Sequence, residues 1–367
     1  MSTLFVKLPE NEVEWLLAAK RARVENTSLL GFRDHRSGSK VTKEQLLCFR
    51  TLVHPLTRQD FNPAYWGLTQ KLATATQELN QSIDFHKFLN AIRNPAAQPT
   101  GDFSQILKMH AEIQAGMDDR YLAKLQQADE APVNVSLICL LQGILDTSST
   151  PVTRWRHTKV RFHAIFGTLP GGVKRSMMAI TDGQLQSVVD HSVKAIVECK
   201  KSERKNTDTS IGMQEVALFV AWIREFHTGP NLRVLVSQDR MQLYITFAET
   251  PINWRGFLLN NRTSGPRSFM RLYRFGPWNL TQANQVKQAA AILLSIMKYL
   301  RRCTPKVRRG VATAALSRFE SATRVDFSNF SSKIGTLREL LKRPLTYAEN
   351  VLYSHLDDKF AEGIARG

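Results

Sequence analysis

The chain has 367 residues, of which 43% are hydrophobic, so it can bury the core of one large domain or two smaller ones. Its longest apolar stretch, residues 289–300, is too short for a membrane span and contains Lys298, which argues against a membrane protein. The formal net charge of +18 favours a polyanionic partner such as nucleic acid, because a Lys or Arg beside a phosphate releases condensed counterions.

Two features of the composition bear on the cellular compartment. Residues 1–17 have acids within their apolar pattern and lack the apolar core of a secretory signal, so we expect an intracellular protein. The cysteines lie far apart and form no CxxC pair; they are Cys48, Cys139, Cys199 and Cys303. This spacing argues against a zinc knuckle and against a disulfide framework.

The first third of the chain, residues 1–130, is predicted to be mostly helical. Asn11 is predicted to cap one helix, and a second helix is expected to begin at residues 61–65, with Pro63 in its first turn. Apolar side chains recur at helical spacing between residues 85 and 92, which predicts a helix with one buried face. The isolated His86 and His110 are assigned surface or packing roles.

A second region begins with an apolar helix predicted over residues 133–145 and continues into a segment that alternates bases with aromatics. The basic residues of that segment are Arg154, Arg156, Lys159 and Arg161. They could contact phosphates while the aromatic rings stack on bases. The same alternation is equally that of an exposed edge strand with a solvated basic face.

The centre of the chain is predicted to be a sheet with one long buried helix. A strand over residues 176–181 ends at Asp182, and a second over residues 194–200 places Glu198 and Lys200 on one face, together with Ile196. A helix with an almost wholly apolar middle is predicted over residues 211–226. Two further strands, 232–237 and 242–248, are joined by a hairpin turn, and helices near Phe257 and over 281–299 complete the domain.

These central elements carry the residue types that metal-dependent phosphodiester cleavage needs. Hydrolysis of this kind requires hard oxygen ligands for a cation and a positive side chain near the reacting phosphate. We expect Asp182, Glu198 and the carbonyl of Cys199 to bind Mg²⁺, and Lys200 to orient water or to stabilise developing charge. Gln214, early in the following helix, is expected to reach the same site.

Asp190 is an alternative to Asp182 as the first acidic ligand of the metal. We prefer Asp182, because the residues between it and Glu198 are enough to form a hairpin, whereas Asp190 is expected to lie in the turn of that hairpin.

The order of Asp182, Glu198-x-Lys200 and the run 214–223 resembles the PD-(D/E)XK nuclease-like superfamily, in the version seen among uncharacterised fungal proteins. The runs 246–249 and 275–278 resemble the same group, and the resemblance covers about residues 100–298. It implies an α/β fold with an αβββαβ core, in which a mixed central sheet is flanked by helices. It also implies Mg²⁺-dependent cleavage of DNA or RNA. The chain departs from the family pattern at Asp182-Gly183, which no proline precedes.

The composition changes at about residue 300. Residues 301–327 are rich in Arg, Ala, Ser and Thr and poor in acids, as a mitochondrial presequence is. Residues 337–358 and 362–367 are similar to the extreme N-terminus of fungal mitochondrial aconitases. The cluster and citrate ligands of that family lie beyond this segment, and no cysteine follows Cys303, so we expect no iron–sulfur cluster and no hydratase activity.

We therefore expect four regions: a helical region 1–130, a nuclease-like domain 131–299, a basic linker 300–336 and an aconitase-like segment 337–367. The last two are expected to be largely unstructured apart from short helices near 337–341 and 347–356. An internal presequence should not direct import, so a nuclear or cytoplasmic location is expected. The expected function is nucleic-acid cleavage with Mg²⁺. The alternatives are an inactive nucleic-acid or protein-binding module and a fused or mis-joined gene product.

Overall fold

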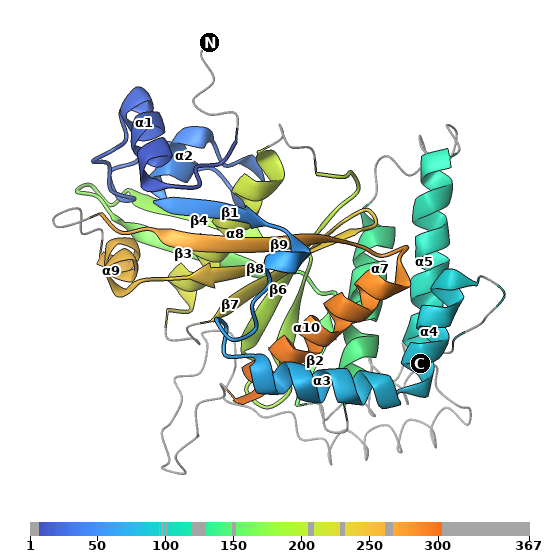
Figure 1. Cartoon of the computed structure of the whole chain (residues 1–367). Coiled ribbons are helices and arrows are strands. Elements are labelled where there is room, and N and C mark those ends of the chain that lie inside the picture. Colours follow the sequence, from blue (N-terminus) through green and yellow to red (C-terminus); the bar gives the residue numbers. More distant parts are fainter. Residues whose placement is uncertain are drawn as a thin grey trace, which may run out of the picture. The chain divides into compact units, whose positions relative to one another are not determined.

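The computed structural model describes residues 7–94, 96, 99, 101–118, 130–148, 152–204, 209–227, 232–260 and 267–302. The chain divides into two compact units, Met1–Thr304 and Pro305–Gly367. The second unit lies outside the described residues, and so do the aconitase-like segment, the short helices that we expected beyond residue 302 and most of the linker expected at 300–336. The start of that linker was predicted too early, because residues 300–302 are still helical. The described part of the first unit has a mixed α/β fold (Figure 1).

One mixed sheet organises the described residues, with the strand order β1-β9-β8-β7-β6-β5-β2. The pairs β1·β9 and β6·β7 are parallel and the other neighbours are antiparallel. The strands are β1 (Thr51–Leu56), β2 (Thr153–Arg156), β5 (Gly183–Ser187), β6 (Val193–Lys200), β7 (Arg233–Asp239), β8 (Gln242–Glu249) and β9 (Met270–Asn279). A separate hairpin consists of β3 (Arg161–Thr168) and β4 (Lys174–Ile180).

The expected mixed α/β fold is confirmed. In chain order, α7 (Ala131–Asp146), β2, β5, β6, α8 (Ser210–Glu225) and β7 follow one another as αβββαβ. The β3–β4 hairpin is inserted between the first and second of these strands. The strand with Glu198 and Lys200, β6, lies between β5 and β7 within the sheet, where both of its edges are paired.

Helices cover both faces of the sheet because β6 and its neighbours carry apolar residues on both sides. Ala195, Val197 and Cys199 face a core that includes residues of α7 and α10 (Ala283–Arg302). Ile196 faces the other core, which contains α8, α1 (Glu12–Ala22), α2 (Lys43–Cys48) and α9 (Ile252–Asn260). Figure 1 shows α10 and α7 on the opposite side of the sheet from α1 and α2.

The N-terminal region is mostly helical, as predicted, but it also supplies a strand to the sheet. Asn11 caps α1 by accepting the backbone N–H of Glu14 at 2.9 Å. The other helices of this region are α3 (Thr69–Gln81), α4 (Ile83–Arg93) and α5 (Gly101–Asp118). β1 pairs in parallel with β9, so residues on both sides of position 130 share one sheet. The boundary that we expected near residue 130 stays a prediction.

The helix expected at residues 61–65 is wrong. This segment forms turns, in which the Asn62 side chain accepts the backbone N–H of Ala64 at 3.0 Å and Gly67 has a φ of 65°. Asn and Gly both stabilise turns locally, and that preference prevails over proline at a helix start. The helix α3 begins only at Thr69.

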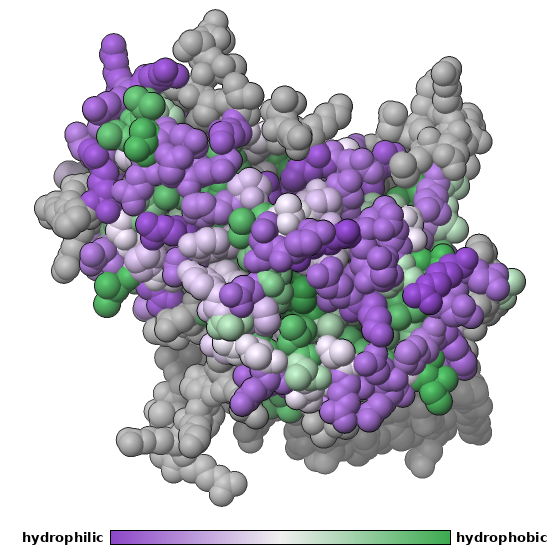
Figure 2. Space-filling view, viewed as in Figure 1, coloured by the Kyte–Doolittle hydropathy of each residue, from purple (hydrophilic) through white to green (hydrophobic). Residues whose placement is uncertain are grey.

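The surface agrees with the basic and polar composition of the chain. Figure 2 shows hydrophilic residues over most of one face, with apolar residues in separate patches. Among the helices of the described residues, none combines the length and the apolar character that a membrane crossing requires.

Candidate active site

Asp182 lies immediately before β5 and is held against β6 by backbone contacts. Its N–H donates to the carbonyl of Val197 at 3.0 Å, and its Oδ2 accepts the N–H of Cys199 at 2.9 Å. The side chain of Asn134, on α7, donates to the Asp182 carbonyl at 2.9 Å. Two elements, β6 and α7, therefore fix Asp182, a residue that is 7% exposed.

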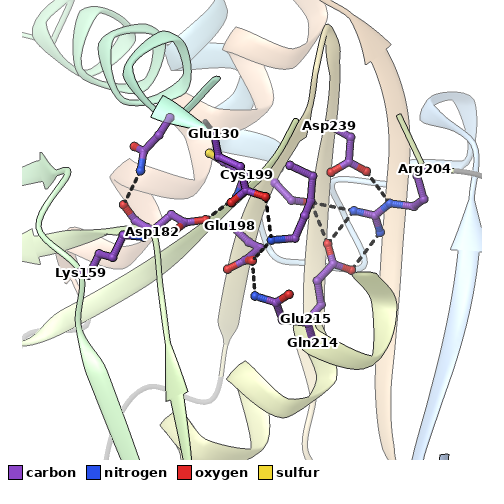
Figure 3. A network of polar contacts seen from close by, with 12 residues as sticks. Glu130, Lys159, Asp182, Glu198, Cys199, Arg204, Gln214, Glu215 and Asp239 are labelled. Carbon is purple, nitrogen blue, oxygen red and sulfur yellow. Dashed lines mark hydrogen bonds and ion pairs between the residues drawn. The ribbon is translucent and has the colours of Figure 1, made fainter. Parts of the chain in front are cut away.

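Glu198 points from β6 toward Gln214, near the start of α8 (Figure 3). Lys200 Nζ lies 2.6 Å from Glu198 Oε1, and the Gln214 side-chain amide donates to the same oxygen. Lys200 Nζ also lies 3.7 Å from the carboxylate of Glu130. The other oxygen of Glu198, Oε2, is buried and has no hydrogen-bond partner within the described part of the chain. The structure thus brings Glu198, Lys200 and Gln214 together, as the sequence predicted.

The electrostatic environment makes Glu198 easy to protonate. Burial raises its pKa to about 8, the carboxylates of Asp182 and Glu215 add to this effect, and Lys200 opposes it. Burial acts to lower the pKa of Lys200, but its interactions with Glu198 and Glu130 prevail and raise that pKa to about 12. Lys200 therefore stays charged at neutral pH, whereas Glu198 gains or loses its proton at a pH close to neutral.

Cys199 contributes backbone rather than side-chain groups to this region. Its side chain faces the core that contains residues of α7 and α10. Burial raises the pKa of its thiol well above the usual range. Its N–H is the group that holds Asp182. The role that we expected for its carbonyl, as a metal ligand, stays a prediction.

Asp182 and Glu198 offer carboxylate oxygens, which are the kind of ligand that Mg²⁺ prefers. Searched over the described residues, the structure holds no group of three or more His, Cys, Asp or Glu arranged as metal ligands. Mg²⁺ does not need such a group, since proteins often bind it through one or two carboxylates while water and substrate phosphate complete the shell. The buried Glu198 Oε2 without a partner is the atom that such a cation would satisfy.

Asp190, the rival acid, lies in the turn between β5 and β6. Its Oδ1 accepts the N–H of Ser192 at 3.2 Å and the hydroxyl of the same residue at 2.7 Å. Partial burial acts to raise its pKa, but hydrogen bonds from Ser187 and Ser192 lower it to about 2. The predicted turn position is therefore confirmed, and the contacts of Asp190 are local to that turn.

The basic segment lies on the edge strand β2 and at the start of β3. Trp155 and Phe162 are 4% and 0% exposed and face the cores, so neither ring can stack on a nucleic-acid base. This favours the edge-strand interpretation. The cations Arg154, Lys159 and Arg161 are exposed, Arg156 is half-buried, and Lys159 Nζ lies 3.2 Å from Asp182 Oδ1.

The sequence did not predict the buried charge cluster beside this site. The guanidinium of Arg204 donates to both oxygens of Glu215, at 2.8 and 3.0 Å, and to Asp239 at 2.7 Å. Ser237 donates its hydroxyl to Glu215 at 2.9 Å, and Arg274 lies 3.6 Å from the same carboxylate. Figure 3 shows Glu215 next to Gln214 on α8, with Arg204 between Glu215 and Asp239.

Arg204 gives Glu215 an environment opposite to that of Glu198. Burial acts to raise the pKa of Glu215, but the Arg204 guanidinium prevails and lowers it to about 2. The one available signal was Glu215 itself, an acid within the apolar middle of a buried helix, since a buried carboxylate needs a partner. The sequence alone could not identify Arg204 as this partner, because Arg204 lies outside the helix, 11 residues before Glu215.

Comparison with known proteins finds similarity only over short segments. Mitochondrial aconitate hydratase of Emericella nidulans is 39% identical over 66 residues, which is 16% of this chain and 8% of that protein. The Aspergillus fumigatus enzyme is 46% identical over 48 residues, covering 13% of this chain and 6% of that enzyme, and the Candida albicans enzyme is 37% identical over 71 residues, covering 17% and 9%. The chain thus spans less than a tenth of the length of these curated relatives.

The predicted similarity to aconitases is confirmed at this level. No family model matches the chain. No solved structure matches it either.

Proposed function

We propose that the site at Asp182, Glu198 and Lys200 cleaves phosphodiester bonds of nucleic acid with the help of Mg²⁺. The observation that carries this proposal is the environment of Glu198: Lys200 and Gln214 both donate to its Oε1, its buried Oε2 has no described partner, and the charge of Asp182 acts on its pKa. The αβββαβ order of the surrounding elements agrees with the nuclease-like resemblance of the sequence.

Each residue has a distinct role in this proposal. Asp182 and Glu198 would hold the cation, which when bound acts as a Lewis acid on a phosphoryl oxygen and on water. Lys200 remains positively charged at neutral pH and offsets negative charge at the phosphate. Gln214 fixes Glu198 Oε1, near the N-terminal end of α8, where the helix dipole also favours an anion.

Nucleic acid would approach over the exposed cations near the site. The Lys159 side chain is 64% exposed and contacts Asp182, so it connects the β2–β3 surface with the buried carboxylates. Arg154 and Arg161 are exposed on the adjoining strands. These groups suit phosphate contacts that position a strand without reading its sequence.

The test is cleavage of end-labelled single- and double-stranded DNA and RNA by the full chain, with Mg²⁺ or with EDTA. We expect cleavage only with Mg²⁺, and a rate at least about 100-fold lower for Glu198→Gln, which removes a ligand charge but keeps the side-chain shape. Lys174→Ala, an exposed change on β4, serves as the control and should cleave normally. Equal rates with Mg²⁺ and EDTA would contradict the proposal.

A second candidate is a catalytically inactive module that binds nucleic acid. It is favoured by the ion pairs that already engage both acids, Lys159 with Asp182 and Lys200 with Glu198. This candidate predicts salt-sensitive binding without cleavage, weakened by Arg154→Glu. Binding that does not change with salt concentration would argue against phosphate contacts.

The similarity to aconitate hydratases covers 6–9% of those enzymes, and the proposed cleavage does not depend on that segment.

A further inference from the structure

A buried arginine lies at the far end of β7 from the candidate active site. Arg233 is 1% exposed, and its guanidinium stacks over the ring of Trp222 at 4.4 Å. Its Nη2 donates to the carbonyl of Phe226, whereas its Nε is buried and has no hydrogen-bond partner among the described residues. Asp239, at the other end of the strand, is six residues away, or roughly 20 Å at about 3.3 Å per residue.

A second arginine, Arg255 on α9, adds to the same positive charge. Its Nε donates to the hydroxyl of Thr250 at 3.0 Å. Its Nη2 is buried and, within the described ranges, has no partner. Burial, followed by the charge of Arg255, lowers the pKa of Arg233 to about 10, and burial lowers the pKa of Arg255.

Among the described residues, neither the buried Arg233 nor the half-buried Arg255 forms an ion pair with a carboxylate. Within the described residues, no acid acts on the pKa of either arginine, in contrast to Arg204 with its two carboxylates. The neighbouring segments 228–231 and 261–266 contain no Asp or Glu in their sequence. A buried charge without a counter-ion is costly, so an anion from outside the chain would stabilise this arrangement.

A pocket with a volume of about 630 Å³ opens beside Arg255. Its lining includes Tyr65, Trp66, Glu249 and Thr250. A volume of this order suits a small organic ligand, since such pockets span about 300–1,000 Å³. Tyr65 is 60% exposed and offers a flat aromatic surface.

The pocket also contains a hydrogen-bond acceptor, Glu249. Its carboxylate accepts the hydroxyl of Tyr65 at 3.4 Å and that of Tyr273 at 3.3 Å. Both bonds are long, so the carboxylate keeps capacity to accept hydroxyl groups of a ligand. The pocket therefore combines a cation, an aromatic surface and a carboxylate.

We propose that this pocket binds a nucleoside monophosphate. Arg255 contacts the phosphate, with Arg233 adding to the local positive charge; Glu249 accepts hydroxyl groups of the sugar, and the Tyr65 ring packs against the base. A guanidinium binds phosphate through paired, charge-assisted hydrogen bonds, and an aromatic ring stacks on any base. The site is separate from Asp182 and Glu198 and does not depend on the proposed cleavage.

The test is isothermal titration of the full chain in EDTA with AMP, CMP, adenosine and inorganic phosphate. EDTA removes divalent cations, so the result is independent of phosphodiester cleavage. We expect AMP or CMP to bind at least about 10-fold more tightly than adenosine or phosphate, because both halves of the ligand are recognised. Arg255→Ala should weaken nucleotide binding by at least about 10-fold, and Tyr65→Ala should weaken it severalfold.

Three controls make the outcome decisive. Arg93→Ala, an exposed change on α4, should leave binding unchanged. Arg255→Lys keeps the charge and should bind better than Arg255→Ala if the charge is what matters. The exposed Tyr65→Ala variant provides a second test should Arg255→Ala fail to fold. Absence of nucleotide binding, or equal binding by the wild type and either alanine variant of the pocket, would overturn the proposal. Equal affinity for AMP and inorganic phosphate would also overturn it.

Discussion

Glu198 and Glu215 are both buried carboxylates near the start of α8, at 1% and 2% exposure, yet their protonation differs. Burial acts to raise the pKa of both. The bidentate contact of Arg204 prevails at Glu215, whereas the single contact of Lys200 does not prevail at Glu198. Glu215 is therefore a permanent charge within the fold, and Glu198 is the acid that can respond to pH or to a cation.

The raised pKa of Glu198 predicts a pH dependence of stability without metal. The folded chain binds the Glu198 proton more tightly than the unfolded chain, so the free energy of unfolding falls as pH rises from about 4.5 to about 8. The loss is at most a few kcal/mol, since one pKa unit is about 1.4 kcal/mol. Urea unfolding in EDTA across this range should show a smaller fall for Glu198→Gln, and parallel curves for both proteins would contradict the assignment.

Gly183 explains in part why Asp182 occupies its position. A Cβ at Gly183 would lie 2.6 Å from the carbonyl oxygen of Arg156 and 2.9 Å from the side chain of Ile138. Only glycine allows β5 to approach β2 this closely, so Gly183→Ala should lower the free energy of unfolding by about 1–3 kcal/mol. Gly256, on α9, has open space around it, so Gly256→Ala is the matched control and should cost nothing. Equal urea midpoints for the two variants would contradict this account.

At the scale of elements, a helix or strand could be predicted where the hydrophobic pattern of its sequence is strong, and could not be predicted where that pattern is weak. The apolar run of α8 and the β-branched run of β6 predicted both elements within one or two residues. β1 contains His54 and Pro55 and has no regular alternation, and its partner β9 lies far along the chain. Proline remains compatible with β1 because that strand lies at the sheet edge, where one side needs no ladder hydrogen bond.

The residues of the candidate site that lie on these well-predicted elements could be predicted as well, and the others could not. Glu198 and Lys200 share a face because a strand has a period of two, and Gln214 follows from the start of the next helix. The contact of Lys159 with Asp182 depends on the inserted β3–β4 hairpin, which the sequence did not place. Arg204 comes from the loop after β6, and its partners lie on α8 and β7, so no local pattern predicted them.

The Arg204 cluster predicts a large cost for breaking one of its ion pairs. Glu215→Gln keeps the side-chain shape but removes the charge that balances Arg204, so the free energy of unfolding should fall by about 3–5 kcal/mol. Glu225→Gln, an exposed change at the end of the same helix, is the control and should cost less than about 1 kcal/mol. Equal losses in urea unfolding would mean that the cluster does not stabilise α8.

At the scale of the whole molecule, both hydrophobic cores lie within the compact unit Met1–Thr304. Residues that complete the sheet come from both ends of this unit, as the pairing of β1 with β9 shows. A chain ending after Thr304 should therefore have the same urea midpoint as the full chain. A lower midpoint for the shortened chain would show that Pro305–Gly367 stabilises this unit.

The most direct test of the central claim is the initial rate of Mg²⁺-dependent cleavage by Lys200→Ala, compared with Lys174→Ala. Lys200 contacts Glu198 at 2.6 Å, whereas Lys174 is an exposed lysine on β4. We predict a rate at least about 100-fold lower for Lys200→Ala and an unchanged rate for Lys174→Ala. Equal cleavage by the two variants would contradict the assignment of the site to Asp182, Glu198 and Lys200.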